Sequence, residues 1–169
     1  SGQIKDTFQA RYNLIRGCII ELLAMHAFQP KDPRFHELGL EQFFAFNVGF
    51  IVEDKLREGC QGMAPDLMLI SDLPDLDGID SYKSTPPELI PVEIKGLKSF
   101  RQNAGYYRGL HLARRQVATT TTVLSHHLKQ GQLKIERGLI ILCCIEHGRF
   151  QMRFHWQQLL QEGHTDSPT

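Results

Sequence analysis

Two short segments of the chain carry residue types that bind divalent cations and activate water. Pro65-Asp66 opens the apolar run of residues 66–70, and Glu93-Ile94-Lys95 closes the apolar run of residues 89–95. If the two runs pair as neighbouring strands, two carboxylates and one ammonium group meet at the strand pair. Alternation along a strand places Glu93 and Lys95 on one face and turns Ile94 into the core.

The chemistry that these groups favour is hydrolysis of a phosphodiester with the help of a metal ion. Mg²⁺ takes oxygen ligands and commonly uses one or two carboxylates together with waters and a substrate phosphate. Asp66 and Glu93 are the predicted ligands of Mg²⁺ or Mn²⁺, and the carbonyl of Ile94 adds a neutral oxygen. Lys95 is expected to orient the attacking water or to stabilise the developing charge. A hard cation neutralises the phosphodiester and lowers the pKa of its bound water.

Apolar spacing predicts the helices and strands that position these residues. Residues 6–27 read as an amphipathic helix, and residues 38–57 as a second helix with a broad apolar face. Strands are expected over 66–71 and 89–95, joined by a turn-rich loop over 72–88. A helix over 104–129 and strands over 138–146 and 149–155 follow, with a turn at His147-Gly148. The apolar stripe of the first helix consists of Phe8, Tyr12, Ile15, Ile19, Leu22 and Leu23.

This order of elements predicts an α/β fold with a mixed sheet flanked by helices. The 169 residues fit one domain over 1–163, followed by a disordered tail over 164–169. Residues 138–146 form a continuous apolar run, which is typical of a strand buried on both faces. Pro91 lacks a backbone N–H and predicts an edge or a bulge for the strand over 89–95.

The two segments and their surroundings resemble the PD-(D/E)XK nuclease superfamily, which has a restriction-endonuclease-like fold. The resemblance covers residues 38–158 in element order, while the motif itself is five residues, Pro65-Asp66 and Glu93-Ile94-Lys95. It implies that Asp66 and Glu93 bind metal and that Lys95 is catalytic. RNA-cleaving viral endonucleases, transposon-type nucleases and repair-type exonucleases all stay open as subfamilies.

The resemblance also implies a third acid in the helix before the motif, in a pattern like Gly-x-x-x-Glu-x-x-Leu. Residues 49–56 fit this pattern, which makes Glu53 the predicted catalytic and metal-binding acid. Glu41 is the second choice, and His36 is a candidate because a subset of viral cap-snatching endonucleases uses a histidine in this region. Many members also place a Gln near the site from the helix after the Lys, and Gln116 is placed to do this.

Charge is distributed unevenly along a chain whose formal net charge is zero. Residues 71–93 hold six acids and one base, whereas the stretch between Glu93 and Glu136 holds eight bases and no acid. A cationic track beside an anionic pocket suits a nucleic-acid partner, either DNA or RNA. The neutral total suggests that affinity depends on a protein partner or a larger parent chain. The predicted nucleic-acid surface comprises Lys98, Arg101, Tyr106, Tyr107, Arg108, Arg114, Arg115 and Gln116.

Composition limits the remaining possibilities. Cys18, Cys60, Cys143 and Cys144 show no CxxC spacing, so free thiols in a reducing compartment, the cytoplasm or the nucleus, are expected. No apolar stretch approaches the roughly 18 residues that span a bilayer, so no membrane partner is expected. Two alternatives to a nuclease stay open. One is a nuclease-fold module that no longer cuts and only binds nucleic acid or protein, and the other is a structural interaction protein with an accidental motif.

Overall fold

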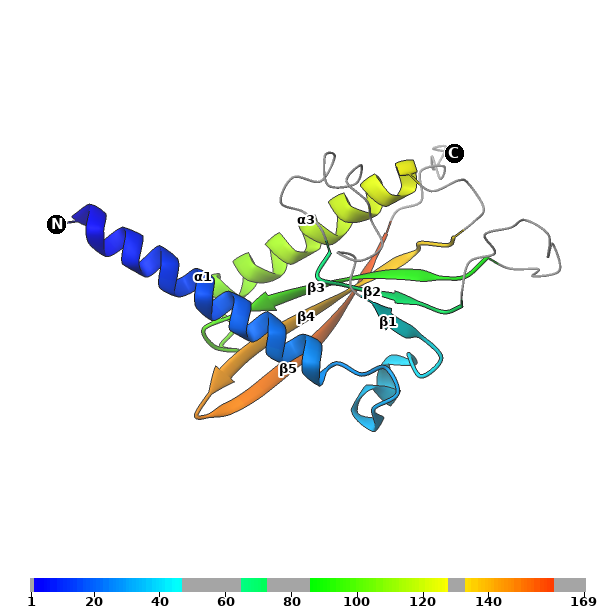
Figure 1. The fold of residues 1–169 in the computed structure, drawn as a ribbon, viewed down its shortest axis with the longest axis horizontal. Coiled ribbons are helices and arrows are strands. Elements are labelled where there is room, and N and C mark those ends of the chain that lie inside the picture. Colours follow the sequence, from blue (N-terminus) through cyan, green and yellow to red (C-terminus); the bar gives the residue numbers. More distant parts are fainter. Residues whose placement is uncertain (1, 47–64, 73–85, 128–132, 160–169) are drawn as a thin grey trace, which may run out of the picture.

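The described part of the chain is a mixed α/β unit built on one five-stranded sheet (Figure 1). The computed structural model describes residues 2–46, 65–72, 86–127 and 133–159. Two α-helices, one short 3-10 helix and five strands lie in this part of the chain. They are α1 (Gly2–Ala27), η1 (Pro33–Leu38), β1 (Phe44–Phe46), β2 (Leu67–Ile70), β3 (Leu89–Gly96), α3 (Ala104–His127), β4 (Arg137–Glu146) and β5 (Arg149–Gln158).

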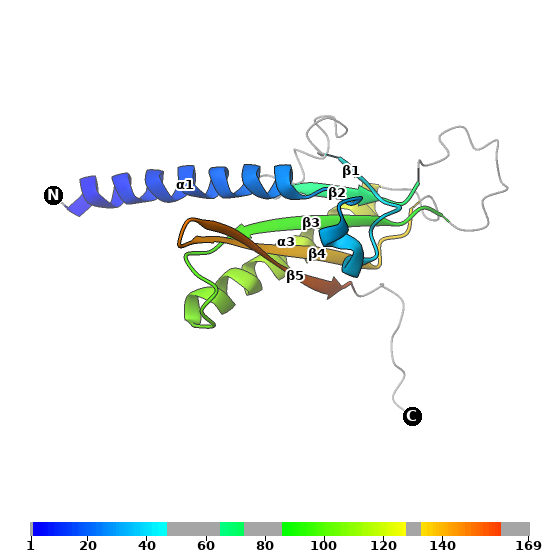
Figure 2. The ribbon, with the colours of Figure 1, turned by 90° about the horizontal axis from the view of Figure 1, so that it is seen from below.

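The strands lie in the order β1-β2-β3-β4-β5. Only β3 and β4 run parallel, because α3 crosses over between them, and the other three pairs are antiparallel. The two α-helices cover opposite faces of the sheet, with α1 on one side and α3 on the other (Figure 2). The prediction of a mixed sheet flanked by helices is confirmed.

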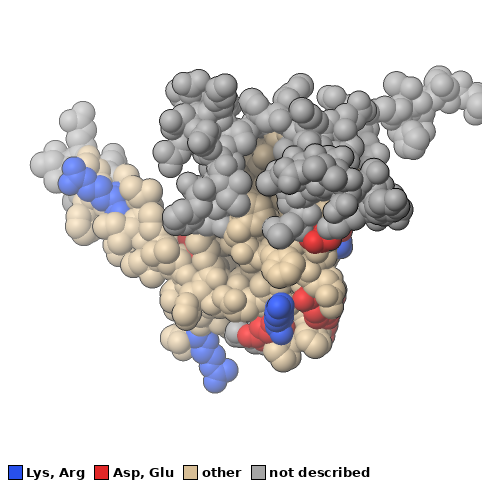
Figure 3. Space-filling model, turned by 45° about the vertical axis from the view of Figure 1, so that its right-hand side comes forward, with Lys and Arg blue, Asp and Glu red and all other residues tan. Residues whose placement is uncertain are grey.

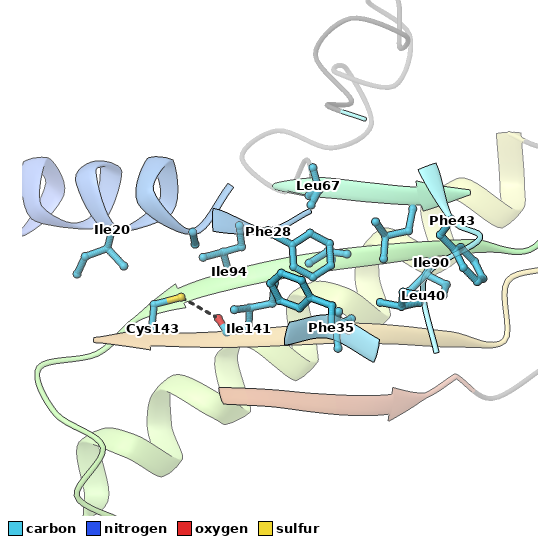
Figure 4. Packing of buried hydrophobic residues seen from close by; sticks show 14 residues of the cluster. Ile20, Phe28, Phe35, Leu40, Phe43, Leu67, Ile90, Ile94, Ile141 and Cys143 are labelled. Carbon is cyan, nitrogen blue, oxygen red and sulfur yellow. Dashed lines mark hydrogen bonds between the residues drawn. The ribbon is translucent and has the colours of Figure 1, made fainter. Parts of the chain in front are cut away.

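Alternation along the strands divides the core into layers on the two faces of the sheet. Ile90, Val92 and Ile94 of β3 face α1, where they pack with Ile20 and Ala24. Figure 4 shows this layer, to which η1 adds Phe35. On the other face, β4 packs its alternate residues against Leu110, Ala113 and Val117 of α3. The adjacent Cys143 and Cys144 fall into opposite layers, as strand geometry requires.

Most of the predicted elements are confirmed within a few residues, but two expectations are wrong. Residues 38–46 do not continue a helix: they hold the end of η1, a turn and β1, an edge strand paired with β2. A short apolar run does not distinguish a strand from a helix by spacing alone. The rest of the predicted second helix, residues 47–57, lies outside the described residues, as do most of the 72–88 loop and the 164–169 tail.

The second wrong expectation concerns Pro91, which lies in an interior strand. It is buried in β3 opposite Met68 of β2. Pairing with β4 begins one residue later, at Val92, so the missing N–H falls at the end of that ladder. The predicted first helix is confirmed as α1, which buries Ile20, Ala24 and the following Phe28 and leaves its periodic apolar stripe exposed.

Close approach of α3 to the sheet requires a glycine at position 138. A Cβ atom on Gly138 would overlap Cγ1 of Val117 and lie 3.4 Å from the carbonyl oxygen of Pro91. Val117 cannot readily turn aside, because a β-branched side chain in a helix has one strongly preferred rotamer.

We therefore expect Gly138→Ala to lower the free energy of unfolding by about 1–3 kcal/mol through overpacking. Gly17→Ala is the matched control, because a Cβ on Gly17 meets nothing within 4 Å and alanine favours the helix by about 0.5–1 kcal/mol. Urea denaturation of both variants measures the difference. Equal stability of the two variants would show that α3 does not pack this closely on β4.

Candidate active site

The pairing of β2 with β3 brings Asp66 beside the Glu-Ile-Lys segment. Leu67 lies opposite Val92 in the antiparallel ladder, so the next position along places Asp66 opposite Glu93. Asp66 Oδ2 accepts a hydrogen bond of 2.8 Å from the backbone N–H of Ile94. The carboxylate thus takes the place of a strand partner just before β2 begins, which fixes its position against β3.

Glu93 and Lys95 lie on the face of β3 that carries α3. Val92 and Ile94 belong to the layer under α1, so the residues between and after them alternate to the other face. The Lys95 stem passes Gly109 of α3, with Cγ 3.8 Å from where a Cβ of that glycine would lie. Its positive charge lowers the pKa values of both Asp66 and Glu93. The structure therefore brings Asp66, Glu93 and Lys95 together.

Burial dominates the electrostatics of this group. Glu93 is only 8% exposed, and desolvation, with the nearby charges of Asp66 and Glu21, raises its pKa to about 8. Desolvation also raises the pKa of Asp66, although the Ile94 N–H and a hydrogen bond from Glu93 work against the increase. Near pH 7 and without a cation, Glu93 stays protonated, and its carboxyl O–H donates a hydrogen bond to the Asp66 carboxylate. The two groups form an acid pair that shares one proton.

A third acid, Glu21 of α1, influences the pair electrostatically, and sequence reasoning missed it. Glu21 has a raised pKa because of burial first and the charge of Asp66 second, while Lys95 lowers it. Helix α1 is held at this end of β3 by Ile20, which covers Gly96, and by Arg16, whose Nη2 donates to the Leu97 carbonyl at 3.1 Å. A signal was present: Glu21 is the only acid between residues 7 and 27, beside the apolar Ile20.

The acids that the sequence favoured for this role are placed elsewhere or are not described. Glu53 lies outside the described residues. His36 and Glu41 face one another, with 3.9 Å between Nδ1 and Oε1, and their side chains are 58% and 37% exposed. The charges that shift the pKa values of Asp66 and Glu93 are those of Glu21, Lys95 and each other. Glu21 is therefore the described acid closest in electrostatic terms to the pair.

The donor set suits a hard cation with a small number of protein ligands. Within residues 2–46, 65–72, 86–127 and 133–159, no three His, Cys, Asp or Glu side chains are arranged as a ready-made metal cage. Mg²⁺ seldom uses such a cage and is commonly held by one or two carboxylates with waters and phosphate. The proton-sharing pair of half-buried Asp66 and buried Glu93 meets that requirement, because a cation could replace the shared proton.

The predicted nucleic-acid surface is only partly assembled. Lys98, Arg101, Tyr107, Arg108, Arg114 and Arg115 are exposed. Tyr106 is buried instead, with its hydroxyl 3.2 Å from Nε2 of His155, so it offers no ring for stacking. Gln116 is half-buried, and its Oε1 is buried with no hydrogen-bond partner among the described residues.

Arginines on α3 and β5 supply positive charge on the sheet face away from α1. Arg114 and Arg153 both lower the pKa of His155, after desolvation, so these three side chains lie near one another. Arg153 stacks 4.4 Å from the Phe100 ring centroid and donates to the Phe100 carbonyl. Figure 3 shows another face of the molecule, on which the described Lys and Arg side chains lie apart from one another.

Comparison with known proteins identified no relative of this chain. No protein-family model, curated protein or solved structure matches the chain. Separately, neither described helix has the length and apolar character needed to cross a membrane.

The raised pKa of Glu93 predicts a distinctive pH dependence of stability. Between about pH 5 and pH 8 the unfolded chain ionises Glu93 while the folded chain keeps the proton, so stability falls as pH rises. Glu93→Gln keeps the shape and a donor toward Asp66 but cannot ionise. In EDTA, we expect the melting temperature of the wild type to fall more steeply across this window than that of Glu93→Gln. Parallel curves would contradict the raised pKa of Glu93.

Proposed function

We propose that this chain is a metal-dependent nuclease with a restriction-endonuclease-like core. The observation that carries the proposal is the pair formed by buried Glu93 of β3 and half-buried Asp66, which directly precedes β2, with Lys95 beside them. Burying the Glu93 carboxyl group next to a second carboxyl group is costly unless a proton or a cation compensates their charge. Such perturbed groups are typical of functional sites.

Each residue has a role that follows from its position. Asp66, held by the Ile94 N–H, and Glu93 would hold Mg²⁺ or Mn²⁺, with the Ile94 carbonyl as the further oxygen expected from the sequence. When bound, the cation would supply charge neutralisation of the phosphodiester and acidify a water molecule. Lys95 adds a positive charge beside the carboxylates, where it can orient the nucleophile or stabilise the developing negative charge.

Two further elements complete the proposal. Glu21 takes the part of the third acid that the sequence had given to Glu53, because its charge raises the pKa of Glu93 and the charge of Asp66 raises its own pKa. The exposed cations Lys98, Arg101, Arg108 and Arg115 follow β3 in the chain and would hold the phosphate backbone of DNA or RNA. A non-cutting nuclease-fold module is the second candidate, favoured by the lack of a three-ligand cage among the described residues.

A cleavage panel separates the two candidates. We expect the wild type to cut at least one of single- and double-stranded DNA and RNA with Mg²⁺ or Mn²⁺ and to lose activity in EDTA. Glu93→Gln, and Lys95→Met, which keeps the stem beside Gly109, should each reduce the rate at least about 100-fold. Glu21→Gln should reduce it as well, whereas Glu41→Gln is the control acid and should leave it unchanged.

Folding of every variant is checked by circular dichroism before cleavage is measured. No cleavage of any substrate by the wild type would favour the binding module. If Glu41→Gln and Glu21→Gln lowered the cleavage rate equally, Glu21 would have no specific role in the site.

Metal binding provides a readout that does not need a substrate. A cation that takes the place of the shared proton should release about one proton on binding near pH 7. Calorimetric titration with Mn²⁺ in two buffers of different ionisation enthalpy measures this release. We expect Glu93→Gln to abolish proton release and to weaken binding at least about tenfold, while Glu41→Gln behaves as the wild type. Heats that are the same in both buffers would contradict the shared proton.

A further inference from the structure

Helix α1 carries an apolar stripe that the sheet does not use. Phe8 is 72% exposed, Tyr12 54%, Ile15 59%, Ile19 49% and Leu22 66%. The side chains that α1 buries against the sheet, Ile20 and Ala24, lie on a different side of the helix. Helix α1 therefore has two apolar faces, one in the core and one in solvent, which an ordinary surface helix does not have.

The spacing of the exposed residues is that of a helix-pairing seam. Phe8, Tyr12, Ile15, Ile19 and Leu22 are separated by alternating steps of four and three, the a and d positions of a heptad repeat. Ile19 at an a position followed by Leu22 at a d position is a combination that favours two-stranded pairing. Leu23 widens the stripe by one side chain and is 40% exposed.

The shape of the molecule leaves this seam open to a long partner. The N-terminal part of α1 projects beyond the end of the sheet in both ribbon views (Figures 1 and 2). Arg16 is turned toward the sheet, where it bonds the Leu97 carbonyl, so its charge does not lie in the stripe. A second straight helix can thus lie along the stripe without meeting the described part of the sheet.

The area of the stripe matches what a dimer needs. The six exposed side chains present on the order of 600 Å² of mainly apolar surface, at the upper limit for the largest patch on a typical monomer. Two such stripes packed on one another bury on the order of 1,200 Å² in total, which is the lower end of the range for specific protein–protein interfaces. A second copy of the chain presents an identical stripe with the same spacing, which makes the seam self-complementary.

We propose that α1 is a dimerisation helix and that two copies of this chain pair along Phe8, Tyr12, Ile15, Ile19 and Leu22. The pair buries the seam and leaves Glu21 on the side of each α1 that faces its own sheet. The proposal does not depend on nuclease activity and is tested without a substrate.

Two neighbouring residues of α1 provide a matched test. Ile15 belongs to the seam, and Leu14 is off the seam although it is equally apolar and 68% exposed. We expect light scattering at about 100 µM to give twice the 19.3 kDa chain mass for the wild type and for Leu14→Glu. Ile15→Glu should weaken dimerisation at least about 30-fold and be largely monomeric, because the pair buries two unpaired carboxylates.

Circular dichroism of all three proteins checks that the fold survives, as expected for substitutions at exposed positions. A monomeric wild type at this concentration would overturn the proposal, as would dissociation of Leu14→Glu and Ile15→Glu to the same extent. A dimer that persists in Ile15→Glu would place the interface elsewhere and overturn it as well.

Discussion

The hydrogen bond from the Ile94 N–H to the Asp66 carboxylate is the interaction on which the site depends. Antiparallel pairing of β2 with β3 reaches its end at Leu67, and the next strand donor would lack a backbone partner. Asp66 supplies that partner and thereby brings a carboxyl group against Glu93. The same contact that closes the ladder creates the acid pair, so strand register and electrostatics have one cause.

Both helices then act on this pair from opposite faces of the sheet. On one face, Gly109 of α3 leaves room for the Lys95 stem and for Leu97. On the other face, Ile20 covers Gly96, which holds the adjacent Glu21 at the end of β3. An ammonium group and a third carboxyl group consequently reach the same two acids from elements far apart in the chain. Their opposing effects on the pKa of Glu93 show that its ionisation is set by the whole arrangement.

The paired segments were predictable from the sequence because strands with strongly apolar surroundings leave few alternatives. Asp66 and Glu93 stand at the ends of runs that are buried along their length, and antiparallel pairing of such runs brings the two together. Glu21 was not predictable in the same way. The apolar spacing along α1 marks the face that carries Phe8, Tyr12 and Ile15. The face that packs on the sheet is a different one, and it carries Ile20 and Ala24. Spacing identifies a face, but it does not tell which partner that face meets.

The two faces of α1 link the proposed dimer to the proposed active site. Only the C-terminal half of α1 packs on the sheet. The projecting N-terminal half is short enough that an isolated helix of its length is marginal in water. Pairing of the projecting half would stabilise the helix that carries Glu21 without contacting the site. Dimerisation would then reduce fraying of α1 and hold the third carboxyl group beside Asp66 and Glu93. In these two proposals the apolar stripe and the acid serve one requirement, a helix that is anchored on both sides.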